Sequence, residues 1–241
     1  MQKSNKSIVT IAFAIMLGIV SNTALAQEGN NHKDVNISSQ EKASSDVEQD
    51  KKAAAWVASL ELRDAAKEER LKEAIVLHLK TVRDWHNDHP YTTVPAGINP
   101  VTGNALSQLD RQVIANSAMP KTVHENLMVA LRKELTEAQV ESILDKYTIG
   151  KVAFTLAGYK AIVPDLTADE ETKILSFLKQ AREQAIDYKN MNQISAIFEI
   201  YKTKSEQFLN SNGRNWRALY KAYTEAAKAR KAAISEGQNK K

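Results

Sequence analysis

The chain has 241 residues, with 33 Lys and Arg against 29 Asp and Glu, and it contains no cysteine. The lack of cysteine excludes a disulfide framework, a thiolate metal site, a cysteine nucleophile and a lipid-modified cysteine anchor. About 43% of the residues are hydrophobic, which is enough for one domain with a core of its own.

The first predicted element is an export signal at residues 1–26. Two lysines precede a thirteen-residue apolar run at 8–20, and the sequence ALA at 24–26 supplies a cleavage site of the A-x-A type. The run is shorter than the ~20 residues that a helix needs to cross a bilayer. We therefore expect cleavage near Ala26/Gln27, a periplasmic or secreted location, no stable membrane insertion and no nucleic-acid partner. Cleavage would lower the formal net charge from +4 to +2, because it removes two lysines and no acid.

Three further segments follow the signal. Residues 27–50 carry six acids and two bases and almost no large apolar group, so we expect a disordered polar linker. Residues 51–234 have the length and the apolar content of one helical domain. Residues 235–241 form a short basic tail, which we also expect to be disordered.

The domain shows helical periodicity along nearly all of its length. Apolar residues recur every three or four positions from Leu71 to Trp85, and Asp64 is a candidate N-cap for this helix. Similar patterns mark helices near residues 56–60, 140–147, 174–185, 194–208 and 216–223. Three pairs have the spacing of a capping box, in which a Thr oxygen accepts from an amide three residues on: Thr122/Glu125, Thr136/Gln139 and Thr167/Glu170.

The predicted fold is therefore all-α, a single-domain bundle of about six or seven helices. One short irregular or extended segment near 148–165 is the exception. Val152, Phe154 and Leu156 alternate there like residues of a strand. Gly158 interrupts the run, and Pro164 prevents a simple helical continuation. A packed connector is the expected role of this segment.

The phrases LTEAQV (135–140) and LTADEE (166–171) resemble the LTxxQ family of periplasmic helical chaperones. Leu135, Thr136 and Gln139 fit that pattern, whereas the second copy has Glu170 in place of Gln. The resemblance implies a Spy-like holdase as one alternative function. The same motif is also a capping box beside an apolar residue, which arises in unrelated helices.

A second resemblance covers most of residues 53–212. The order AAAWVASLELRDAAKEERLKEAIVLHL, DKYTIGKVAFTLAGYKAIVPDLT and KILSFLKQAREQA is similar to a family of exported Bacteroidetes proteins of unknown function. Sugar binding has been suggested for that family, and no catalytic residue is carried over from it. The resemblance implies an exported helical domain that takes part in polysaccharide utilisation. Its most characteristic segment, Lys146–Thr167, adds Tyr159 to the candidate ligand-binding residues.

The stretch DWHNDHPYTTVPAGINPVTG (84–103) is the main candidate site. Aromatic rings can lie on the apolar face of a sugar, and planar polar groups can bind its hydroxyls. The candidate ligand-binding residues here are Trp85, His86, Asp88, His89, Tyr91 and Asn99. A helix end sealed by Trp85 and followed by a rigid Pro-rich connection is the competing interpretation. We expect a carbohydrate-binding accessory protein with no cofactor.

Two other interpretations of this stretch stay open. His86 and His89 are three residues apart, but His89 precedes Pro90 and is pushed out of the helical region, so the pair does not define a metal site. Carboxylates and His near 84–89 could serve a glycan-active enzyme. No nucleophile motif or phosphate loop accompanies them, which favours a non-catalytic role. His78, on the apolar stripe of the same helix, is expected to be a buried core histidine.

The C-terminal helix is a second candidate surface. Residues 214–241 carry eight bases and two acids, and the cations Arg214, Arg217 and Lys221 are interleaved with Trp216, Tyr220 and Tyr223. Aromatics at this spacing favour a core stripe. The alternative is a basic aromatic surface suited to an acidic polysaccharide.

Overall fold

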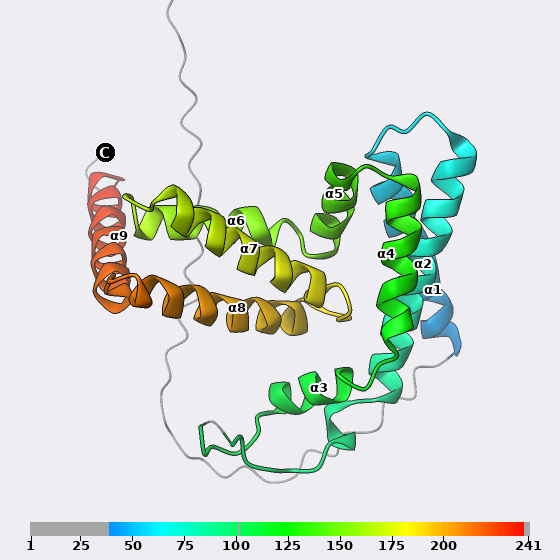
Figure 1. Ribbon diagram of the computed structural model, residues 1–241, viewed down its shortest axis with the longest axis horizontal. Coiled ribbons are helices and arrows are strands. Elements are labelled where there is room, and N and C mark those ends of the chain that lie inside the picture. The colour runs from blue at the N-terminus through cyan, green and yellow to red at the C-terminus, as the bar shows by residue number, and fades with distance from the viewer. Residues whose placement is uncertain (1–38, 101, 239–241) are drawn as a thin grey trace, which may run out of the picture. The chain divides into compact units, whose positions relative to one another are not determined.

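The computed structural model describes residues 39–238 except residue 101 (Figure 1). The predicted signal peptide and residues 27–38 lie outside this part. The described residues form nine α-helices and one short 3-10 helix, η1 (Tyr91–Thr93). The α-helices are α1 (Ser39–Ala58), α2 (Ala65–Asp88), α3 (Gln108–Asn116), α4 (Lys121–Glu134), α5 (Glu137–Tyr147), α6 (Lys151–Ile162), α7 (Ala168–Ala185), α8 (Met191–Ser211) and α9 (Trp216–Gln238).

The all-α class is confirmed, but the predicted number of six or seven helices was too low. The sequence patterns missed α3 and α6. Within the described part, an isolated β-bridge between Ile98 and Ala105 is the nearest approach to a sheet. In that same part, no helix combines the length and the apolarity that crossing a membrane requires.

The predicted extended segment near 148–165 was wrong, because residues 151–162 form α6. This helix is apolar around most of its circumference, so its sequence has no polar stripe from which a helical period could be recognised. Its N-cap is Gly150, whose φ of 65° lies in the left-handed region and separates α6 from α5. Pro164 follows the last helical turn and therefore marks where α6 ends.

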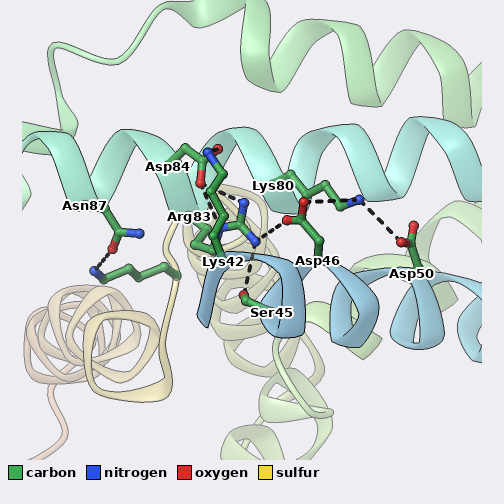
Figure 2. Close-up of polar contacts among 9 residues, drawn as sticks. Lys42, Ser45, Asp46, Asp50, Lys80, Arg83, Asp84 and Asn87 are labelled. Carbon is green, nitrogen blue, oxygen red and sulfur yellow. Dashed lines mark hydrogen bonds and ion pairs between the residues drawn. The ribbon is translucent and has the colours of Figure 1, made fainter. Parts of the chain in front are cut away.

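Residues 39–50 were assigned to the disordered linker, but they form the first half of α1. Figure 2 shows why this polar stretch packs on α2: its charged side chains meet opposite charges there. Arg83 Nη1 lies 2.6 Å from Asp46, Lys80 Nζ lies 3.3 Å from Asp50, and Lys42 Nζ lies 3.1 Å from Asp84. Composition alone counted these charges as solvated. At the other end, α9 continues to Gln238 and so includes the first residues of the predicted tail.

Local capping signals were mostly interpreted correctly. Asp64 caps α2 by accepting from the Lys67 amide, and the capping boxes at Thr136 and Thr167 are both present. The box predicted at Thr122 was wrong, because the N-cap of α4 is Pro120 and Thr122 already lies inside the helix. The motif LTEAQV is thus accounted for by the start of α5.

Two hydrophobic clusters hold the helices together. The first joins α1, α2, α4 and α5 around residues such as Ile75, Leu131 and Ile143, all of them fully buried. The second joins α6, α7 and α8, and the first turns of α9 pack against it; Leu178 and Phe198 lie at its centre. The turn after α7 serves both clusters, because Ile186 belongs to the first and Tyr188 to the second.

Candidate functional site

Three of the predicted residues at the end of α2, Trp85, His86 and His89, make contacts within the chain. His86 is 1% exposed, and its Nε2 donates to the backbone oxygen of Asp187 at 2.9 Å, while its Nδ1 lies 3.1 Å from the Gln112 amide. Burial lowers the pKa of His86, which favours the neutral ring. Trp85 is half-buried, and His89 stacks on it with ring centroids 3.7 Å apart. One face of Trp85 is therefore covered from within the chain.

The other predicted ligand-binding residues lie in different surroundings. Asp88 is exposed at the last position of α2, and Tyr91 packs under the guanidinium of Arg111 at 5.3 Å. Asn99 accepts from the Thr102 amide within the loop. Tyr159 is 2% exposed and donates from its hydroxyl to a backbone oxygen of α8.

A cavity of about 460 Å³ lies elsewhere, between the start of α4 and the second half of α7. Its wall consists of Asn116, Met119, Pro120, Lys121, His124, Glu125, Gln180, Glu183, Gln184, Asp187 and Tyr201. None of the seven predicted ligand-binding residues is among them. Six of these eleven residues carry a side-chain amide or carboxylate, and Tyr201 of α8 supplies an aromatic ring.

One carboxylate of this wall, that of Asp187, has a side chain that is only 16% exposed. It accepts from two histidines that belong to different helices. His78 Nε2 of α2 lies 3.0 Å from Oδ1, and His124 Nδ1 of α4 lies 3.0 Å from Oδ2. The turn after α7 positions the carboxylate, and the apolar stripes of α2 and α4 position the two rings. The expectation that His78 is a buried histidine is confirmed.

The electrostatics of the cluster follow from these contacts. Burial of Asp187 opposes its ionisation, but the hydrogen bonds from His124 and His78 outweigh it and lower the pKa of the carboxyl. The same bond raises the pKa of His124, against the effect of burial. On its other side, His124 Nε2 lies 3.7 Å from the Glu183 carboxylate. The His124 ring is therefore held between two acids at the cavity wall.

The members of this cluster lie far apart along the chain, so no local sequence pattern predicts it. Asp187 is separated from His78 by 109 positions and from His124 by 63. Spacing motifs only detect groups that share one element. The available signal was an acid in the apolar stretch AIDY (185–188), where a buried carboxylate needs a cationic or hydrogen-bonding partner.

The residues of the cavity and of the Asp187 cluster are suited to hydrogen bonding and proton transfer more than to binding a metal ion. Among the described residues, no three His, Asp or Glu side chains are arranged to hold a metal. His86 and His89 do not form a pair: His86 binds the Asp187 backbone, and His89 Nδ1 lies 3.0 Å from the Trp85 carbonyl.

Fold and site define an all-α domain with a cavity against a partly buried carboxylate–histidine cluster. The family model described as "Protein of unknown function (DUF3826)" matches residues 46–229, and the chain belongs to that family. The match begins inside α1, which agrees with the docking of α1 on α2. It lends no support to the resemblance to LTxxQ chaperones, and it assigns no ligand. No curated protein is similar enough to the chain to count as a match.

Proposed function

We propose that the protein is an exported accessory protein that binds carbohydrate in the cavity between α4 and α7. The observation that carries this proposal is the composition of the wall, which combines side-chain amides and carboxylates with the ring of Tyr201. Planar amides and carboxylates bind neighbouring hydroxyls in pairs, and an aromatic ring covers the apolar face of a sugar. Export rests on the N-terminal signal of the sequence, which lies outside the described residues.

The size of the cavity supports the same proposal. Its volume of about 460 Å³ is within the range of small-molecule sites, roughly 300–1,000 Å³. A ligand of one or two sugar rings is the size class that such a volume accepts. The opposite charges of Lys121 and Glu183 on the wall favour a polar ligand over an apolar one.

Isothermal calorimetry against neutral and acidic oligosaccharides tests the proposal. The double variant Gln180→Ala/Gln184→Ala should abolish binding without loss of stability, because both side chains are exposed on the cavity wall. Tyr91→Ala, at the loop favoured by the sequence, is the matched control and should bind like the parent. Absence of heat with every sugar at millimolar concentration rejects carbohydrate binding. If only Tyr91→Ala loses binding, the sugar binds at the loop after α2 and not in the cavity.

A second candidate function, hydrolysis of a bound glycan, is favoured by the orientation of His124. His124 donates from Nδ1 to Asp187, while its Nε2 lies at the cavity wall, 3.7 Å from the Glu183 carboxylate, where it could transfer a proton as a general acid or base. In hydrolysis, water would add to the anomeric carbon while the glycosidic C–O bond breaks and the leaving oxygen takes a proton. The sequence suggested residues 84–89 for acid–base catalysis. We assign that role to His124 instead, because His86 is buried and bonded to the backbone.

An assay for released reducing ends, run on the oligosaccharides that bind, distinguishes hydrolysis from binding alone. His124→Gln should then abolish turnover while the sugar still binds. A parent protein that binds sugar without releasing reducing ends is a binding protein only.

A further inference from the structure

The C-terminal helix α9 (Trp216–Gln238) has a face that the rest of the domain does not use. It packs against α6 and α8 through its first turns, where Trp216 and Leu219 meet the second hydrophobic cluster. Figure 1 shows α9 running from the end of α8 past the ends of α7 and α6 toward the C-terminus. Most side chains after Thr224 are exposed among those described. The length of α9 is therefore not explained by core packing.

The exposed cations of α9 gather on one side. Arg217, Lys221, Lys228 and Lys231 are all exposed. At 3.6 residues per turn, these four positions fall within a sector of about 80°, and at 1.5 Å per residue they extend over about 21 Å. Lys221 Nζ lies 3.9 Å from Glu225, a solvent-exposed pair of little strength.

The cations of α9 differ from those of α2 in having few acidic partners. The cations of α2 meet acids of α1 at close range, as with Arg83 and Asp46 at 2.6 Å. The α9 segment 216–238 has five bases and two acids in its sequence, so its own residues cannot balance the charge. A row of like charges on one helix costs free energy unless a counter-charge meets it.

An aromatic side chain borders the row of cations. Tyr220 is 45% exposed and stacks on Trp216 at 6.0 Å, with an angle of 27° between the rings. Tyr220 is therefore a partly exposed ring, and it lies between Arg217 and Lys221 in the sequence of the helix. The combination of a rigid ring and a line of cations matches a polymer that carries both sugar rings and anionic groups.

We infer that this face of α9, defined by Arg217, Tyr220, Lys221, Lys228 and Lys231, binds an acidic polysaccharide. The charges are complementary to a chain of carboxylates or sulfates, and the length of the row spans several sugar units. An anionic membrane is less well matched, because the opposite flank of the helix carries mostly alanines and offers little apolar surface for insertion. The surface is separate from the cavity, so this inference does not depend on the proposed function.

Affinity electrophoresis or calorimetry of the full mature chain with polygalacturonate tests the inference, with neutral dextran for comparison. Retention by polygalacturonate and not by dextran is expected, and it should weaken as salt rises, because added ions screen exposed charges. The variant Arg217→Gln/Lys221→Gln/Lys228→Gln/Lys231→Gln should bind about tenfold more weakly or worse.

A matched variant separates this face from net charge. Lys51→Gln/Lys52→Gln/Arg132→Gln/Lys133→Gln removes the same number of exposed charges from α1 and α4. It should bind like the parent; equal loss in both variants overturns the inference. Circular dichroism establishes that α9 stays helical in each.

Further variants and competing ligands identify which chemical group this face of α9 recognises. Tyr220→Ala should weaken binding several-fold and leave the salt dependence unchanged, as expected for a ring contact. Vesicles with 30% phosphatidylglycerol and a DNA duplex should bind less tightly than polygalacturonate at equal charge; tighter binding to either one overturns the assignment to a polysaccharide. The cavity variant Gln180→Ala/Gln184→Ala should retain polymer binding, so failure of the cavity proposal remains distinguishable.

Discussion

Replacement of Asp187 is the most direct test of the cluster at the cavity. In Asp187→Ala, the N–H groups of the buried His78 and the partly buried His124 lose their common acceptor, at 3.0 Å from each. A hydrogen bond to a charged group contributes about 1.5–3 kcal/mol, and removal of one partner of a buried ion pair costs about 3–5 kcal/mol. Because the two bonds share one carboxylate, their effects are not additive. We expect the free energy of unfolding to fall by about 3–5 kcal/mol.

The isosteric variant Asp187→Asn should cost less, about 1–3 kcal/mol. Its amide oxygen can still accept from one histidine, and its NH₂ group can donate to the other ring once that ring is neutral. Urea denaturation followed by circular dichroism measures both variants, with Asp88→Asn on the exposed end of α2 as control. A loss below about 1 kcal/mol in Asp187→Ala would refute the argument, because surface substitutions stay within about 0.5 kcal/mol.

The remaining predictions concern pH and the packing around α2. The pKa of His124 is raised above its ordinary value of 6.5, so the stability that this ring contributes is fully present below pH 6.5 and is lost as the pH rises through the folded value. The difference in unfolding free energy between the parent and His124→Gln should therefore shrink from pH 6 to pH 9; a constant difference would contradict the ion pair. Trp85→Ala should lower stability by about 3 kcal/mol through lost packing, whereas Tyr91→Ala should change the melting temperature little. Arg83→Ala should speed hydrogen exchange in residues 39–50, since the 2.6 Å contact to α1 is removed.

Patterns within one element predicted the helices well. The stripe from Leu71 to Trp85, the N-cap at Asp64 and the boxes at Thr136 and Thr167 all depend on residues a few positions apart, and the structure confirms them. The helix α6 was missed for the opposite reason, because a helix that is apolar on most sides shows no period.

The packing of α1 and the candidate site both depend on contacts between residues far apart in the sequence, which no local pattern predicts. Arg83 and Asp46 explain why a polar, acid-rich stretch is helical, yet each looks like a solvated charge in the sequence. The loop after α2 was predicted as the site because aromatic and polar residues are concentrated in it. The cavity wall includes Gln and Glu residues of α7, which are common on exposed helices and give no such signal. Composition identifies dense clusters of unusual residues, but it is blind to common residues that the fold brings together.

The turn after α7 places three successive side chains in three different surroundings. Ile186 enters the first hydrophobic cluster, Asp187 meets the histidines, and Tyr188 enters the second cluster. Most surface connections accept an inserted or deleted residue, because their side chains have no fixed partners. Here a single insertion would move all three residues out of register at once. Length, more than composition, is the property of this turn that any variant of the protein must keep.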